Sequence, residues 1–108
     1  MVNPIRGEIT AILDDKPYTL CLTLGALASL ENKLGAENLA ALSKKFADGS
    51  LSSKDLIAII EAGLEGGGND VSTLDVSAMK VKGAVNGFVD IAARLLEATF
   101  TPLAGEQQ

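Results

Sequence analysis

The spacing of apolar residues changes once along the chain, near Thr23, and this change restricts the possible folds more than any other feature. Before Thr23, apolar side chains alternate with period two in segments 8–13 and 18–22, which is the spacing of half-buried β-strands. After Thr23 they recur every three or four residues, as on one face of an α-helix. A short β part followed by a helical remainder predicts the α+β class.

The two strand segments are separated by residues 14–17, Asp-Asp-Lys-Pro. Acidic residues before a proline are typical of turns, so the sequence predicts an antiparallel β-hairpin with a loop of about four residues. A hairpin alone is marginally stable in water, so its apolar face must be covered by the helices that follow.

Helix start and stop signals divide the rest of the chain. Thr23 can cap a first helix that stops at Gly35, and Asn38 can cap a second that carries Phe46 and ends at Gly49.

The third predicted helix has the clearest start. Ser52 and Asp55 have the spacing of a capping box, and Leu51 can pack on Leu56 as a hydrophobic staple. Its stop is the run of three glycines at 66–68.

The same device recurs at Ser72 and Asp75, which predicts a short fourth helix ending near Met79. A last helix is expected from about residue 84 to about residue 100, because Pro102 disfavours much continuation.

The expected architecture is one domain over residues 1–108, ordered from about 5 to about 101, with a flexible tail at 102–108. The hairpin packs on four to five α-helices, and the fold is mostly helical. The predicted core consists of Leu13, Leu20, Leu22, Leu27, Leu30, Leu42, Phe46, Leu56, Ile59, Ile60, Phe88, Ala92 and Leu95.

Charge and hydropathy exclude several classes of function. The net charge is −5 and the nine cationic residues are scattered, whereas binding of nucleic acid phosphates requires a basic face. Apolar stretches fall far short of the roughly 20 residues that span a bilayer. The N-terminal segment lacks the apolar centre of a signal peptide. We therefore expect no nucleic acid, no membrane and a cytoplasmic location.

Candidates for chemistry are few. The chain has no histidine, which removes histidine-based triads, bases and metal ligands. Cys21 has no obvious base and fits a small strand residue. The glycines at 66–68 follow a helix and lack the Gly-Lys-Ser/Thr of a phosphate loop. Asp14 and Asp15 without a third ligand are better explained as a turn than as a cation site. We expect no enzyme activity, catalytic residue, cofactor or metal.

The last predicted helix carries more apolar surface than one packing face needs. Its apolar arc covers roughly 180° of the circumference, against about 100° for a surface helix. Either the helix is central and buried on two sides, or part of the arc meets a partner. The candidate partner-binding residues are Val85, Phe88, Val89, Leu96 and Phe100.

Three stretches together resemble one family: NPIRGE at 3–8, PYTLCLTLGALASLE at 17–31 and LSSKDLIAIIEAGLEGGG at 51–68. They are similar to the small tail proteins of gene transfer agents and related siphophage-like prophages, over about residues 3–100. Such proteins have been labelled both tail tube proteins and tail assembly chaperones.

The resemblance implies a non-enzymatic role in the assembly of a phage-like tail in bacteria. A tail assembly chaperone would bind the helical tape-measure protein and the tail tube protein in the cytoplasm. The alternatives are a structural tail tube component of the particle and an unrelated small protein-binding module. Mostly helical content favours the chaperone, because a tube wall usually needs a substantial sheet. The exposed edge of the hairpin leaves a homo-oligomer open.

Overall fold

The computed structural model describes residues 7–34, 44, 48 and 52–106. In chain order the elements are β1 (Glu8–Leu13), β2 (Lys16–Cys21), α1 (Leu24–Leu34), α3 (Ser53–Gly66), the 3-10 turns η2 (Val71–Thr73) and η3 (Val76–Ala78), and α4 (Val85–Glu106). The α+β class, the N-terminal antiparallel hairpin and the mostly helical content are confirmed. The described part of the chain holds three α-helices and two 3-10 turns in place of the predicted four to five helices.

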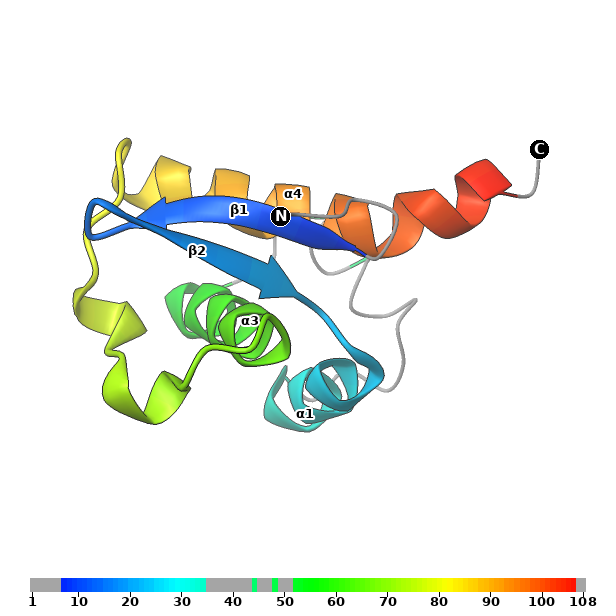
Figure 1. The fold of residues 1–108 in the computed structure, drawn as a ribbon, viewed down its shortest axis with the longest axis horizontal. Helices are drawn as coiled ribbons and strands as arrows, with labels where there is room; N and C mark the ends of the chain where they lie inside the picture. The colour runs from blue at the N-terminus through cyan, green and yellow to red at the C-terminus, as the bar shows by residue number, and fades with distance from the viewer. Residues whose placement is uncertain (1–6, 35–43, 45–47, 49–51, 107–108) are drawn as a thin grey trace.

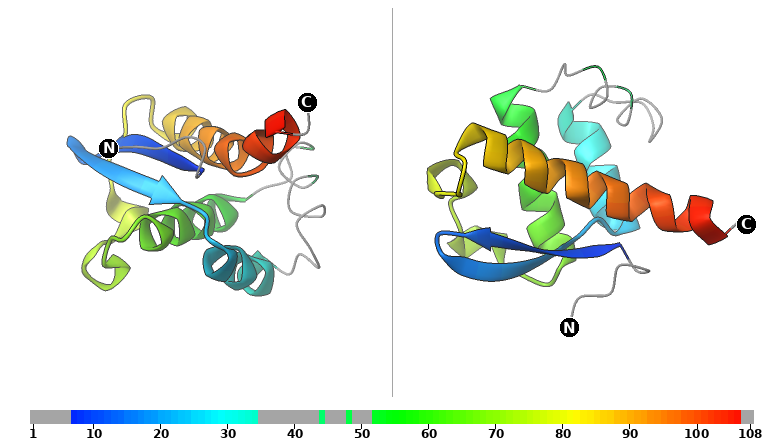
Figure 2. Two further views of the ribbon diagram at one scale, coloured as in Figure 1. Left: turned by 45° about the vertical axis from the view of Figure 1, so that its right-hand side comes forward. Right: turned by 90° about the horizontal axis from the view of Figure 1, so that it is seen from above.

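β1 runs in front of α4, and α3 lies below β2 (Figure 1). α1 lies beside α3, and the view from above shows α4 crossing over both of them (Figure 2). The apolar face of the sheet and the inner faces of the helices thus enclose one buried cluster.

Most of the predicted core is confirmed. The buried members are Leu13, Leu20, Leu22, Leu27, Leu30, Ile59, Ile60, Ala92 and Leu95. Leu56 and Phe88 are partly buried against this cluster instead of lying within it. Leu42 and Phe46 fall outside the described residues. Of the helix predicted to run from Asn38 to Gly49, the structure describes only Lys44, which is helical, and Asp48, which lies in a turn.

The hairpin turn is shorter than predicted. β1 and β2 pair from Glu8 opposite Cys21 to Leu13 opposite Lys16, so the turn contains only Asp14 and Asp15, with φ of 52° and 63°. A type I′ turn requires positive φ at both central positions, and aspartate tolerates this conformation better than most residues. The predicted four-residue loop is therefore wrong.

The predicted helix starts at Thr23 and Ser52 are confirmed. Ala26 N–H donates to Thr23 Oγ1 at 3.1 Å. Asp55 N–H donates to Ser52 Oγ at 3.2 Å while Ser52 N–H donates to Asp55 Oδ2 at 2.9 Å, which completes a capping box. Leu51 and Gly35, which were expected to assist a start and a stop, are outside the described residues.

The glycines that end α3 also let it approach β2 closely. A Cβ atom at Gly66 would collide with the Cys21 carbonyl oxygen, and one at Gly67 with that of Thr19. The side chain of Asn69 follows and donates from Nδ2 to the Thr19 carbonyl at 2.9 Å.

The fourth predicted helix does not form. Asp70 Oδ1 accepts from Ser72 N–H at 3.1 Å, so Asp70 takes the capping position, and Asp75 Oδ1 accepts from Ser77 Oγ at 2.6 Å. Leu74 between them is extended, with φ −114° and ψ 139°. Short polar side chains that bond to the nearby backbone compete with helix formation, and two 3-10 turns result.

The last helix is longer than predicted. α4 begins at Val85, after Ala84 with a positive φ of 54°, and continues past Pro102 to Glu106. Pro102 removes one backbone donor and its ring crowds the carbonyl four residues earlier, yet the helix continues for one more turn to Glu106. The expected stop near Phe100 is wrong, while the flexibility of the tail stays a prediction.

Candidate functional site

An apolar groove opens where the N-terminal halves of α3 and α4 meet the η3 turn. It has a volume of about 180 Å³. Its lining residues are Ser53, Leu56, Ile57, Ile60, Val76, Ser77, Val85 and Phe88. We call this site the α3–α4 groove.

Side chains of graded burial form the groove. Ile60 and Val76 are almost completely buried and form its floor. Leu56 and Ile57 of α3 and Phe88 of α4 are half-buried and also line the groove. The capping box at the start of α3 fixes the first turn, so these side chains are held on a rigid element.

The structure brings together part of the predicted partner-binding set. Val85 is 66% exposed at the rim, Phe88 is half-buried in the groove, and Val89 is 40% exposed one turn further along α4. Leu96 is 5% exposed and supports α4 from the core. The side chain of Phe100 is outside the described part of the chain.

Sequence reasoning missed the contributions of α3 and of η3 to this site. The apolar arc of α3 covers roughly 160° of the helix, which is wider than the stripe a surface helix needs. That surplus is the same signal that singled out α4. It could have pointed to Ile57, which lies between the buried face and the solvent face.

Polar chemistry in the groove is limited to two serine side chains. Ser77 Oγ is engaged with Asp75 Oδ1 at 2.6 Å. Among the described residues, no group of three or more His, Cys, Asp or Glu side chains is placed to hold a metal ion. The hydroxyl and amide of Ser72 hold the pKa of Asp70 below its ordinary value of 3.8, but Asp70 is exposed and does not line the groove. The groove is therefore suited to apolar contacts.

A second cleft lies between β1 and α4, with a volume of about 360 Å³. Asp15, Asp90, Lys80, Lys82 and Arg94 line it together with apolar residues. Because both signs of charge are present, and Arg94 is paired with Asp90 at 3.1 Å, this cleft indicates no single class of ligand.

The helices of the described residues include none that is long and apolar enough to cross a lipid bilayer.

Comparison with known proteins assigns the chain to the phage tail proteins. A family model described as phage tail tube protein, GTA-gp10, matches residues 6–101, and the chain belongs to this family. The resemblance to gene transfer agent tail proteins is thereby confirmed. No curated protein and no solved structure gave a significant match.

Proposed function

We propose that the protein is a tail assembly chaperone that holds an amphipathic helix of the tape-measure protein in the α3–α4 groove. The observation that carries this proposal is an apolar groove built from three elements and continued by exposed Val85 and Val89 on α4. Membership of a phage tail family supplies the partner class, because the tape measure is the long helical component of such tails. The tail tube protein is the second expected partner.

The size of the groove suits one anchoring side chain. A cavity of about 150 Å³ holds a single benzene ring, so 180 Å³ accommodates one large apolar residue. A bound helix presents apolar residues at i, i+3, i+4 and i+7. When one apolar residue of the bound helix fills the groove, the next apolar residue of that helix can lie on Val89.

Hydrogen bonds at the two edges of the hairpin favour an assembly chaperone over a structural subunit of the tail tube. The Thr10 carbonyl of β1 accepts from Arg94 Nη1 at 3.1 Å, and the Thr19 carbonyl of β2 accepts from Asn69 Nδ2 at 2.9 Å. A sheet that continues between subunits needs such backbone groups for its neighbours. Their use within the chain supports the chaperone.

A structural tail tube component is the second candidate, favoured by the description of the family as a tail tube protein. It predicts that the protein is found in purified particles at a copy number like that of a tube subunit. Its absence from particles by quantitative mass spectrometry would reject this role.

Co-expression with the tape-measure protein of the same tail tests the chaperone. We expect the tape measure to stay soluble with the wild-type protein and to precipitate without it. Val85→Lys places a charge at the rim of the groove and should remove the effect. Leu24→Lys is a matched control, because Leu24 is 83% exposed on α1 and does not line the groove.

Two outcomes count against the proposal. A tape measure that is equally insoluble with and without the wild-type protein rejects the chaperone role. A Val85→Lys variant that works as well as Leu24→Lys rejects the groove as the binding site while leaving the role itself intact.

A further inference from the structure

One wall of the α3–α4 groove comes from residues 69–80, part of the connection between α3 and α4, which we call the strap. The strap contributes Val76 and Ser77 of η3 to the groove. It contains only the two short 3-10 turns η2 and η3, so regular helical hydrogen bonding does not fix its course. What holds the strap in place therefore determines the shape of the groove.

The start of the strap is tied to β2. Asn69 Nδ2 donates to the Thr19 carbonyl at 2.9 Å and to the Leu64 carbonyl at the end of α3 at 3.1 Å. The same residue's N–H donates to the Leu64 carbonyl at 2.9 Å. Asn69 thus joins the last turn of α3, the strap and the hairpin.

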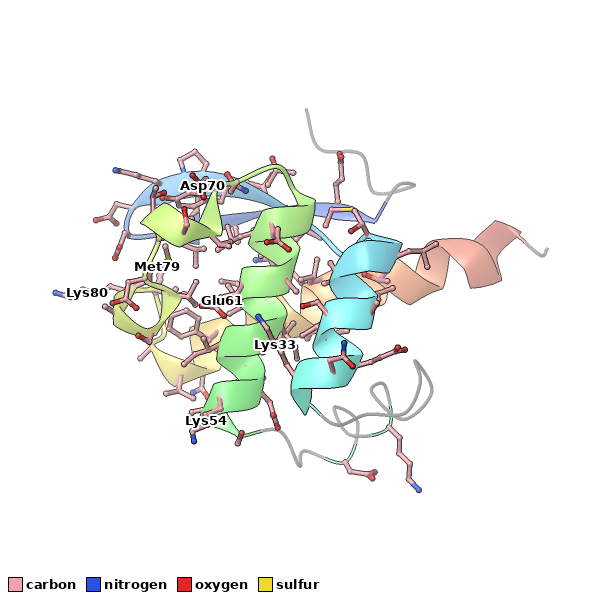
Figure 3. The ribbon with its side chains drawn as sticks, turned by 90° about the horizontal axis from the view of Figure 1, so that it is seen from below. Lys33, Lys54, Glu61, Asp70, Met79 and Lys80 are labelled. Carbon is pink, nitrogen blue, oxygen red and sulfur yellow. The ribbon has the colours of Figure 1, made fainter. Side chains whose placement is uncertain are left out.

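The end of the strap is tied to the hairpin turn. Asp14 N–H donates to the Lys80 carbonyl at 2.9 Å, and Lys80 N–H donates to Asp14 Oδ1 at 2.8 Å. The Lys80 side chain points outward from the molecule (Figure 3), so the contact uses its backbone alone. These two hydrogen bonds close a reciprocal clamp between residues 66 positions apart in the sequence.

Two buried side chains lie between the tied ends. Val76 is 2% exposed and Met79 is 8% exposed. Met79 N–H donates to the Val76 carbonyl at 3.1 Å and directly precedes the clamped Lys80. A displacement of Lys80 would therefore be passed through one 3-10 turn to the wall of the groove.

We propose that Asp14 is a positioning residue of the groove: through its clamp on Lys80, the hairpin turn sets where the η3 wall stands against α3 and α4. The inference rests on the proposed function only where it concerns binding. The N-terminal hairpin would thus influence the shape of the α3–α4 groove although none of its residues lines the groove.

Three variants of the turn separate the clamp from the turn itself. Asp14→Gly keeps the left-handed backbone but removes the side-chain acceptor for Lys80 N–H. Asp14→Asn keeps both the backbone preference and a side-chain oxygen. Asp15→Gly makes the same change at the neighbouring turn position, where φ is also positive, at 63°.

Two measurements on the full-length chain test the inference. The first is amide hydrogen exchange at Ala78 and Met79, whose N–H groups donate to Asp75 and Val76 and do not touch Asp14. The second is the affinity for overlapping 20-residue peptides that cover the tape-measure protein. Since one such hydrogen bond is worth a factor of about three to ten in an equilibrium, we expect Asp14→Gly to speed exchange and weaken binding by that factor. Asp14→Asn and Asp15→Gly should behave as the wild type.

The outcomes are distinct. Faster exchange confined to Lys80, or equal effects of Asp14→Gly and Asp15→Gly, would overturn the positioning role. If the wild type binds no peptide, the proposed function fails, and faster exchange at Ala78 and Met79 in Asp14→Gly would still support the strap mechanism.

Discussion

Replacing Gly66 with alanine tests the close approach of the end of α3 to the backbone at the end of β2. The new Cβ would overlap the Cys21 carbonyl oxygen and approach the Cys21 carbonyl carbon to 3.0 Å. Both are backbone atoms, so no side-chain rotation relieves the collision. Overpacking of this kind costs about 1–3 kcal/mol. Alanine regains up to about 1 kcal/mol through helix propensity, which, at the full gain, leaves a net loss of up to roughly 2 kcal/mol.

Gly25→Ala makes the same chemical change where there is room. Gly25 lies in the first turn of α1, and its nearest neighbour would be Thr23 Oγ1 at 3.9 Å. Alanine there should stabilise the protein by up to roughly 0.5–1 kcal/mol. Urea unfolding followed by circular dichroism measures both variants, and the difference corresponds to several degrees in Tm. A Gly66→Ala variant as stable as Gly25→Ala would refute the close contact.

Three further changes have defined outcomes. Ser52→Ala removes the acceptor for Asp55 N–H and should lower the free energy of unfolding by about 1 kcal/mol in a urea titration. Ser72 holds the pKa of Asp70 below 3.8, so an NMR titration should place the midpoint of the Asp70 carboxyl below that pH. The hydrogen bonds from Ser72 to the carboxylate should therefore persist above pH 3.8 and be lost as the pH falls through the lowered pKa. Ser72→Ala should return the midpoint toward 3.8. Ala84→Asn should raise Tm by easing the left-handed backbone at φ 54°, with a gain of roughly 0.5–1 kcal/mol.

Local signals predicted those parts of the fold that local interactions decide. The capping box at Ser52 and the cap at Thr23 act within three residues, and both form as expected. The second capping pattern failed because Asp70, two residues earlier, takes the Ser72 amide. A segment of about eight residues also gains little from helix formation, since nucleation is costly. The same Ser-x-x-Asp pattern can therefore give a helix or a 3-10 turn, depending on which acidic side chain accepts the hydrogen bond from the serine N–H.

Sequence reasoning predicted the candidate site only on its α4 side, although the wide apolar arc of α3 also pointed to it. Val85 and Phe88 followed from the wide apolar arc of one helix. The contribution of Val76 depends on the course of the strap, which is held by the clamp between Asp14 and Lys80. A contact between residues 66 positions apart leaves no periodic signal in a single sequence. Sequence reasoning therefore identified the α4 wall of the groove, whereas the α3 and η3 walls were identified only from the structure.

The cost of opening the hairpin edges bears on the choice between the two proposed roles. A subunit that joined a continuous sheet through β1 would have to release Arg94 from the Thr10 carbonyl, and through β2 it would have to release Asn69 from the Thr19 carbonyl. Each release forfeits about 0.5–1.5 kcal/mol, and loss of the Asn69 contact would also free the start of the strap. A tube role that used the β2 edge would therefore couple assembly to distortion of the α3–α4 groove. A chaperone role leaves both the hairpin and the groove as they stand, which is why we regard it as the better match to this fold.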